Sequence, residues 1–361
     1  MVASALIHAR DRLLQHSGVD EDVDEVLQAA LRALHDVAVF RWAAVMTVDP
    51  RTILPTAGVV EGFDPSACAP FWDLELVSPG YNKFADLARR APPVSTLFDA
   101  TDGELTRSPL FNDLYAGLGA SDELRVAFVL GSTCWGVGTL IRDEPNGAFT
   151  DAELRDVQTV GHLIARALRQ AVIHGESQAD AATAILVVDG DNRIEHLTAD
   201  GHRMLESVRG FRYGGDDAAD ELPGLLLALL TRARHSNSQT IMTTRIQAAS
   251  GRWLRVTAAP TEAHDGHVAL TLEPARPADL LPMMLETYGL TEREITIVMS
   301  LARGLTSKDI AAELTLSPYT VRDHVKAIYR KCGVNTRGEL VARLFTEHLR
   351  PAFEERVFAG D

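Results

Sequence analysis

The apolar positions of the first 174 residues change from a helical spacing to an alternating one and back. Over residues 1–40 they recur every three or four residues, as at Val23, Val26 and Leu27, which predicts helix. The capping box Thr150-Asp-Ala-Glu153 begins a long helix running to about residue 173. Between these helices the pattern predicts strands at 41–49, 53–60, 74–78, 94–98, 122–131 and 135–142, with helices at 81–90 and 109–118. Helices around a central antiparallel sheet make an α+β domain, placed at residues 1–174.

A second, smaller α+β pattern covers residues 180–274. Alternating runs and short helical runs predict a hairpin at 184–189 and 193–197, helices at 199–208 and 222–233, and strands at 240–248, 253–261 and 268–273. The polar stretch 175–180 separates this domain from the first. Three prolines between residues 274 and 282 predict a linker over residues 275–288.

The last quarter of the chain carries closely spaced helix start and stop signals. Thr291 and Glu294 form one capping box and Thr336 and Glu339 another, and Thr306 with Asp309 is an acidic variant of the same motif. Ser317 and Pro318 fit the N-cap and first turn of a further helix, and Gly304 and Gly333 stand where helices end. These signals predict an all-α domain of four helices at residues 289–350, followed by a tail at 351–361.

One helix of this domain, at residues 317–332, has the pattern of a DNA-reading helix. Its apolar positions share one face, and Arg322, Lys326 and Arg330 form a basic row on another. In a helix-turn-helix such a helix lies in the major groove, where Arg and Lys donate to guanine and Asp323 can accept from cytosine. Thr306, Lys308 and Lys331 are placed for phosphate contacts. The predicted DNA-binding residues are Thr306, Lys308, Ser317, Thr320, Arg322, Asp323, His324, Lys326, Arg330 and Lys331.

The same stretch, from about residue 290 to 345, resembles the LuxR/GerE-type helix-turn-helix domain. The resemblance implies a DNA-binding transcription regulator, with Arg322, Asp323 and Lys326 as the base-reading residues. Asp323 departs from the family, which often has a neutral residue there. The resemblance rests on Leu290-Thr-x-Arg-Glu294, Gly304, Ile310-Ala311, Leu314, Ser317, Thr320-Val-Arg322, His324, Ile328, Lys331, Val334 and Arg337.

The N-terminal region resembles a GAF domain over residues 20–173. The resemblance rests on the segment Trp135-Gly-Val-Gly-Thr-Leu-Ile-Arg142, on Phe149-Thr-Asp-Ala-Glu-Leu154 and on the helix that follows them. It implies a small-molecule pocket between the sheet and its covering loops, and dimerisation through the first and last helices. The order of elements in residues 180–274 resembles a compact PAS-like domain.

Aromatic residues cluster where the GAF resemblance places the pocket. Apolar walls with a few polar groups are typical of small-molecule sites. The competing interpretation is an aromatic core beside a salt bridge. The candidate ligand-binding residues are Phe71, Trp72, Tyr81, Phe84, Asp122, Arg125 and Trp135, with Glu123 close by.

The net charge of −15 becomes informative when it is divided along the chain. Residues 286–350 hold 10 Lys and Arg against 8 Asp and Glu, whereas the rest holds 25 against 42. Three of the four lysines lie in the terminal domain. Because an acidic surface repels polyanions, we expect nucleic-acid contact to be confined to that domain.

Several chemistries find no support in the sequence. The three cysteines are far apart, which predicts neither a disulfide framework nor a metal site. Nucleotide-binding, metalloprotease and serine-hydrolase motifs are missing, so we expect no cofactor and no enzymatic activity. The longest apolar run is too short to cross a bilayer and no leader precedes it, which favours the cytoplasm. Asp49 is interpreted as a turn residue rather than a phosphorylation site.

Together these patterns predict a one-component, sequence-specific transcription regulator that binds double-stranded DNA as a homodimer. A small-molecule effector bound in the N-terminal sensor region would control it. The alternative is a LuxR-type regulator controlled by a protein partner.

Overall fold

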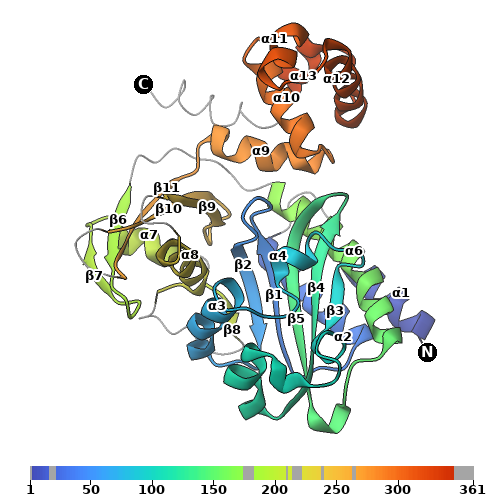
Figure 1. Cartoon of the computed structure of the whole chain (residues 1–361), viewed down its shortest axis with the longest axis vertical. Helices are drawn as coiled ribbons and strands as arrows, with labels where there is room; N and C mark the ends of the chain where they lie inside the picture. The colour runs from blue at the N-terminus through green and yellow to red at the C-terminus, as the bar shows by residue number, and fades with distance from the viewer. Residues whose placement is uncertain are drawn as a thin grey trace. The chain divides into compact units, whose positions relative to one another are not determined.

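The computed structural model describes residues 2–15, 22–173, 183–208, 210–213, 222–236, 240–261 and 266–344. The chain folds into two compact units (Figure 1). The first comprises residues 1–130, 134–176 and 180–274, and the second consists chiefly of residues 275–361. Each unit is described by itself.

A six-stranded sheet forms the centre of the first unit, in the order β3-β4-β5-β1-β2-β8. Strand β1 pairs antiparallel with β2 and β5, so that Val45 lies opposite Val59 and Gly138. The short strand β8 pairs parallel with β2. The strands are β1 (Trp42–Val48), β2 (Pro55–Glu61), β3 (Val94–Thr96), β4 (Ala120–Leu130), β5 (Thr133–Asp143) and β8 (Arg212–Tyr213).

Three helices, α1 (Val2–Gln15), α2 (Val23–Val37) and α6 (Asp151–Ile173), pack together beside this sheet (Figure 1). The predicted helices at both ends of the region are confirmed. The Thr150 capping box forms, since Glu153 N–H donates to Thr150 Oγ1 at 3.3 Å and Thr150 N–H to Glu153 Oε2 at 2.9 Å. Gly136 allows α6 to approach closely, because a Cβ there would lie 2.6 Å from a Leu168 methyl carbon.

Short helices and turns lie along the chain between β2 and β4, where the sequence predicted more regular elements. The predicted strand at 74–78 is wrong, because helix α3 runs through Leu76. Helix α3 contacts α8 and lines a cavity over the sheet, so it lacks the one-sided pattern that identifies a surface helix. The helices are α3 (Cys68–Leu76), α4 (Phe84–Leu87) and α5 (Leu97–Ala100), with a π-helical turn Phe111–Tyr115 and 3-10 turns Pro65–Ala67, Leu105–Arg107, Ala116–Leu118 and Glu144–Asn146.

A second, five-stranded antiparallel sheet completes the first unit, in the order β7-β6-β11-β10-β9. Every strand and helix predicted for residues 184–273 is confirmed within a few residues. The elements are β6 (Ala184–Val188), β7 (Ile194–Leu197), α7 (Gly201–Ser207), α8 (Gly224–Arg234), β9 (Met242–Gln247), β10 (Trp253–Pro260) and β11 (Val268–Pro274).

The two sheet regions share one hydrophobic core, in which Met46 and Trp72 belong to the same cluster as Leu186 and Leu229. Polar contacts also join them. Asp49 at the end of β1 is buried, and its carboxylate pairs with Arg245 of β9 at 2.7 Å. Residues 1–174 and 180–274, predicted as separate domains, therefore pack as one compact unit. The predicted boundary at 175–180 lies outside the described residues.

The second unit consists of helices, as predicted. Helix α9 occupies most of the predicted linker 275–288, so the expectation of a linker is corrected there. Pro277 stands in its first turn, where proline costs little, and Leu281 and Leu285 join the core of the unit. Residues 345–361 lie outside the described part. The helices are α9 (Pro277–Thr287), α10 (Glu292–Ala302), α11 (Ser307–Glu313), α12 (Pro318–Cys332) and α13 (Arg337–Leu344).

Candidate functional site

Helix α12 is fixed at both ends by the residues that the sequence indicated. The Ser317 hydroxyl accepts a hydrogen bond from Thr320 N–H at 3.0 Å, and Gly333 adopts the left-handed conformation, with φ +62°, that ends the helix. Val321, Ile328 and Cys332 are buried in the core of the unit, which also contains Ile310 of α11. The predicted apolar face is therefore buried, and the rotation of α12 about its axis is set.

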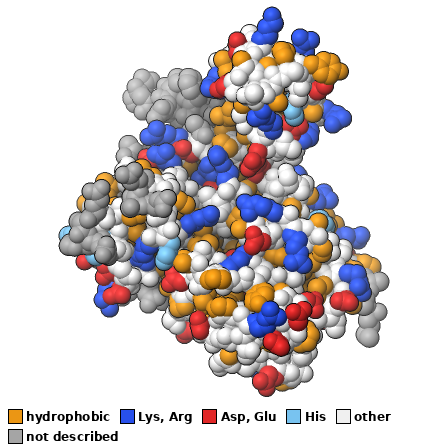
Figure 2. All heavy atoms as spheres, in the orientation of Figure 1, with side chains coloured by type: hydrophobic (Ala, Val, Ile, Leu, Met, Phe, Trp, Pro, Cys, Tyr) orange, Lys and Arg blue, Asp and Glu red, His pale blue; other side chains and the backbone are white. Residues whose placement is uncertain are grey.

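This rotation leaves the basic row of α12 in solvent. Arg322, Lys326 and Arg330 are exposed, while Thr320 and His324 are partly buried beside them. Lys326 Nζ lies 4.0 Å from Asp323 Oδ1, and the two side chains are 81% and 52% exposed. Lys and Arg side chains project from this unit on the side where Figure 1 draws α12 (Figure 2). Such a weak, exposed pair can be exchanged for contacts with another molecule at little cost.

Helix α11 precedes α12 and begins at another capping box. Thr306 Oγ1 accepts a hydrogen bond from Asp309 N–H at 3.3 Å, and the Asp309 carboxylate accepts one from Thr306 N–H at 2.9 Å. Lys308 lies exposed in the first turn. The side chains of Thr306 and Ser317 are thus engaged as helix caps.

Lys331 differs from the other predicted DNA-binding residues, because its ammonium is bonded within the unit. Nζ donates to the Gly289 carbonyl at 2.8 Å and to Glu294 Oε2 at 2.7 Å. Burial works to raise the pKa of Glu294, but hydrogen bonds from Lys331 and Thr291 outweigh it and hold the pKa below its ordinary value. Lys331 therefore joins α12 to the start of α10.

The first unit contains a cavity of about 130 Å³ between the first sheet, α3 and the segment before β8. Of the predicted ligand-binding residues, Phe71 and Trp72 line it; Tyr81, Phe84, Asp122, Arg125 and Trp135 do not. The wall is mostly apolar and aromatic. It comprises Ala44, Met46, Val60, Phe63, Asp64, Ala67, Cys68, Phe71, Trp72, Leu114, Tyr115, Leu118, Thr139 and Phe211.

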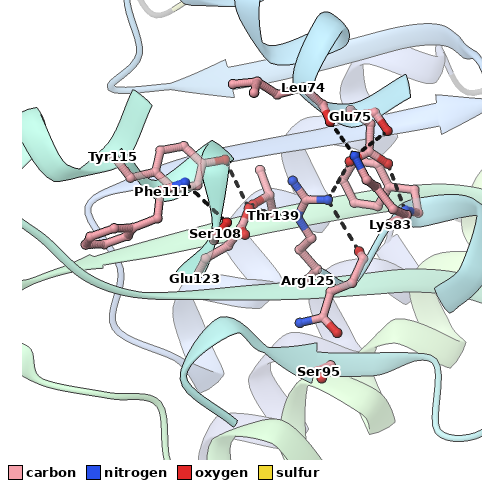
Figure 3. Close-up of polar contacts among 12 residues, drawn as sticks. Leu74, Glu75, Lys83, Ser95, Ser108, Phe111, Tyr115, Glu123, Arg125 and Thr139 are labelled. Atoms are coloured by element: carbon pink, nitrogen blue, oxygen red, sulfur yellow. Dashed lines mark hydrogen bonds and ion pairs between the residues drawn. The ribbon is translucent and has the colours of Figure 1, made fainter. Parts of the chain in front are cut away.

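Arg125 lies in a buried ionic cluster next to this cavity (Figure 3). Its guanidinium donates to Glu123 Oε1 at 2.8 Å and to Glu75 Oε2 at 2.6 Å, and it lies 5.6 Å from the centre of the Phe71 ring. All three charged side chains are at most 4% exposed. Burial works to lower the pKa of Arg125, but Glu123 and Glu75 outweigh it and raise the pKa well above its ordinary value.

The cluster reaches the cavity through two hydroxyl groups. Tyr115 and Thr139, which both line the cavity, donate to Glu123 Oε1 at 3.0 and 2.8 Å (Figure 3). On the other side, Lys83 donates to the backbone carbonyls of Leu74 and Glu75. Burial lowers the pKa of Lys83, and the nearby Glu75 opposes that shift. The salt bridge beside an aromatic core is present, and it lies behind the cavity wall, which it contacts through Tyr115 and Thr139.

Asp122 has a different role, because successive residues of a strand point to opposite faces. Its carboxylate accepts from the backbone N–H groups of Phe98, Phe149 and Glu123 at 2.8–3.0 Å. Burial raises its pKa to about 6, against these three donors, which lower it. Asp122 therefore joins β4 to α5 and to the segment before α6.

Comparison with known proteins identifies the second unit. The profile of bacterial regulatory proteins of the luxR family matches residues 289–344. The spore germination protein GerE of Bacillus subtilis is 40% identical over 55 residues, which cover 15% of this chain and 74% of that protein. The chain belongs to the LuxR family of bacterial regulatory proteins.

Other likenesses are shorter or more distant. The transcriptional regulatory protein UhpA of Escherichia coli is 46% identical to the LuxR-family domain over 56 residues, or 16% of this chain. That match spans only 29% of the length of UhpA. The crystal structure of a GAF domain/HD domain protein from Geobacter sulfurreducens covers 44% of this chain and all of its own, at 22% identity and a TM-score of 0.33. A TM-score this low does not establish a shared fold.

The contacts of Lys331 give a prediction about the stability of the LuxR-family domain. Replacing Lys331 with methionine leaves the buried Glu294 carboxylate without its ammonium partner, so we expect the domain to lose about 1–3 kcal/mol of stability. Faster amide hydrogen exchange in α10 and α12 would show this loss. Lys308→Met is the matched control, because Lys308 is exposed and its replacement should leave the exchange rates unchanged.

The raised pKa of Asp122 gives a prediction about pH. The folded protein holds this proton more tightly than the unfolded chain, whose carboxyl titrates near pH 4. This contribution to stability is therefore fully present below about pH 4 and is lost as the pH rises through about 6. We expect the free energy of unfolding of the wild type, minus that of Asp122→Asn, to fall by about 2–3 kcal/mol from pH 4 to pH 7. A difference that stays constant or increases over this interval would contradict the shift.

Sequence reasoning missed most of the cavity wall. Met46 and Val60 were assigned to strands, but nothing in the sequence indicated which face would be covered. Phe211 lies more than 130 residues after Trp72 and in a different predicted domain, yet the two rings stack with centroids 6.4 Å apart.

Within the described residues, no helix is long and apolar enough to cross a membrane, and no cluster of three or more His, Cys, Asp or Glu side chains is arranged for a metal ion.

Proposed function

We propose that the protein is a one-component transcription regulator that binds specific sequences of double-stranded DNA through its LuxR-family domain. The main support is the placement of α12. Its apolar face is buried in the core of the domain, while Arg322, Lys326 and Arg330 remain in solvent. A helix anchored in this way can insert its basic face into a major groove without exposing its core.

The interface divides by function. Arg322, Asp323 and Lys326, near the start of α12, are proposed to read bases, because the early residues of a recognition helix reach the base edges. Lys308 in the first turn of α11, together with Arg330, is proposed to contact phosphates. We propose that the backbone and neighbouring positions contribute to the DNA interface at Thr306, Ser317, Thr320 and His324. Lys331 is left out of the interface, because its ammonium is engaged by Gly289 and Glu294.

The remaining parts of the proposal concern the first unit and assembly. Residues 1–174 are proposed to be a GAF-like sensor, 180–274 a PAS-like region and 289–350 the DNA-binding domain, in accord with the order of their elements. A small molecule bound in the first unit would control the regulator. We further propose a homodimer, because one domain of this size contacts a single half-site and a second copy supplies the other.

The proposal is tested by selecting duplexes from a random pool with the full-length protein and measuring affinity by fluorescence anisotropy. Enrichment of a motif with two related half-sites, bound by two chains, is the expected result. Failure of the folded protein to bind any duplex, even at low salt, would reject DNA binding. Enrichment of a single half-site by a monomer would reject the dimer alone.

Lys308 gives a test of phosphate contact. Lys308→Ala should weaken binding to the selected duplex and to a random duplex by the same factor, because phosphates are alike in every sequence. It should also lower the slope of log K against log salt by about one. Salt titrations on both duplexes measure the two effects. A loss confined to the selected duplex would instead assign Lys308 to base reading.

A further inference from the structure

The cavity of the first unit is built from both sheet regions, and its size limits what it can hold. Its volume is about 130 Å³. An apolar protein cavity of about 150 Å³ stays free of water and accepts benzene. The space here therefore suits a molecule with a single ring.

Trp72, one of the residues that line the cavity, carries a hydrogen-bond donor that has no partner among the described residues. Trp72 is 2% exposed, and its Nε1–H is buried and makes no hydrogen bond among the described residues. The indole is held in place by Phe71, edge-on at 5.1 Å between ring centroids, and by Phe211, stacked at 6.4 Å. A buried donor left unpaired is unfavourable, so a ligand that supplies an acceptor gains a bond that the empty cavity lacks.

The other polar groups of the wall disfavour a charged ligand. Tyr115 and Thr139 already donate their protons to Glu123, so their hydroxyl oxygens are left to accept. Asp64, the one charged side chain in the described lining, accepts hydrogen bonds from Ser66 N–H and Oγ. An anion would face these acceptors without a cation in the lining, and a cation would leave water for a mostly apolar wall.

Phe211 closes the cavity from the second sheet region and fits a slot made by two glycines. A Cβ at Gly58 of β2 would lie 2.7 Å from the Phe211 ring, and one at Gly224, where α8 begins, 2.5 Å from it. The two residues after Phe211 form β8, which pairs with Val59 and Val60 of β2. A ligand that packs on the Phe211 ring therefore also contacts the connection between the two sheet regions.

The geometry points to a binding site for an uncharged, single-ring molecule with one hydrogen-bond acceptor. The acceptor receives a hydrogen bond from the Trp72 indole N–H, and the ring packs against Phe211. This inference rests on the proposed control by a small molecule and adds the chemical class of the ligand. Because Phe211 and β8 hold the second sheet region to the first, an occupied site strengthens that connection and an empty one weakens it.

Two probes of nearly the same shape test the acceptor. Acetophenone carries a carbonyl oxygen where α-methylstyrene carries a methylene group. Calorimetric titration of the full-length protein should show saturable binding of both, with acetophenone about five-fold tighter, the usual effect of one neutral hydrogen bond. In the protein labelled with ¹⁵N-tryptophan, acetophenone should shift one indole N–H resonance, and that resonance should be missing from Trp72→Phe.

Two tryptophan variants test whether the preference for acetophenone depends on the Trp72 indole N–H. Trp72→Phe keeps an aromatic ring but removes the donor, so the preference for acetophenone should disappear or reverse, because its carbonyl then loses water without gaining a bond. Trp253→Phe is the matched control, because Trp253 is also 2% exposed and its indole N–H has no partner in the described part of the chain, but it does not line the cavity. It should keep the five-fold preference. A preference that survives Trp72→Phe, or equal binding of the two probes to the wild type, would overturn the inference.

Gly58→Ala tests the closure by Phe211. The added methyl group collides with the Phe211 ring, so both probes should bind about ten-fold more weakly, and pairing Gly58→Ala with Phe211→Leu should recover part of the loss. Wild-type affinity in folded Gly58→Ala would rule out Phe211 as part of the site. Duplex selection on the same preparation separates the two proposals: DNA binding without probe binding rejects this inference alone, and probe binding without DNA binding rejects only the proposed function.

Discussion

Replacing Arg125 with methionine should lower the free energy of unfolding of the first unit by about 3–5 kcal/mol. Methionine fills much of the space of the arginine side chain but leaves Glu75 and Glu123 buried without their cation. The loss is large because two carboxylates at most 4% exposed cannot recover their hydration while the fold persists. Urea unfolding followed by tryptophan fluorescence measures it. All four tryptophans (Trp42, Trp72, Trp135 and Trp253) lie in the first unit, so the signal reports that unit alone.

Arg107→Met is the matched control. Arg107 pairs with Asp102 at 3.1 Å, but the two side chains are 47% and 87% exposed, so the loss should be under about 1 kcal/mol. Combining Arg125→Met with Glu75→Gln should cost less than the sum of the single changes, because the second replacement removes one of the uncompensated charges. Equal losses for Arg125→Met and Arg107→Met would show that the buried cluster contributes little to stability.

The predictions from sequence were most accurate for helices whose first residue is set by local hydrogen bonds to the backbone. The capping boxes at Thr150, Thr291 and Thr306 all form, and the helices they begin start within a residue of the predicted positions. At Thr336 the predicted box forms only in part. Glu339 N–H donates to the Thr336 hydroxyl, but the Glu339 carboxylate accepts its hydrogen bond from Asn335 N–H. Such motifs satisfy local donors and acceptors, so they can be read without knowledge of the rest of the fold.

The predictions of secondary structure were wrong for elements that pack against other parts of the protein on more than one side. Helix α3 is packed against α8 and lines the cavity, and its last residues, Leu74 to Leu76, were interpreted as part of a strand. Helix α9 was taken for a linker because of its prolines, although Pro277 stands where a helix tolerates proline. In both cases tertiary contacts outweigh the local pattern.

Of the seven candidate ligand-binding residues only two line the cavity, and for one of the others the sequence already held the reason. Phe71 and Trp72 line the cavity as predicted. Asp122 was grouped with Glu123 and Arg125, although strand alternation places neighbouring residues on opposite faces. Phe211 carried no such signal, because its position over the cavity depends on how the two sheet regions pack. A local sequence pattern does not contain that information.

Arg322→Ala should reduce affinity for the selected duplex by about 1–3 kcal/mol while changing affinity for a random duplex much less. Arg322 lies in the second turn of α12, and the buried Val321 beside it fixes the rotation of the helix. A guanidinium held there can donate twice to one guanine, and alanine loses both bonds. Lys326→Ala should lower the same specific affinity by a similar amount. Anisotropy titrations on the selected duplex, on single-base variants of it and on a random duplex measure these losses.

Arg303→Ala separates base reading from the loss of one positive charge. Arg303 follows α10 and pairs with Glu313 at 2.9 Å, so its replacement changes the net charge as Arg322→Ala does without touching α12. We expect Arg303→Ala to leave the ratio of specific to random binding unchanged and Arg322→Ala to lower it by about ten-fold or more. For Arg322→Ala the single-base variants should also show where specificity relaxes, because the position that Arg322 reads will tolerate any base once the side chain is gone. Equal losses on selected and random duplexes would place Arg322 on the phosphates, and the base-reading role would then pass to other residues of α12.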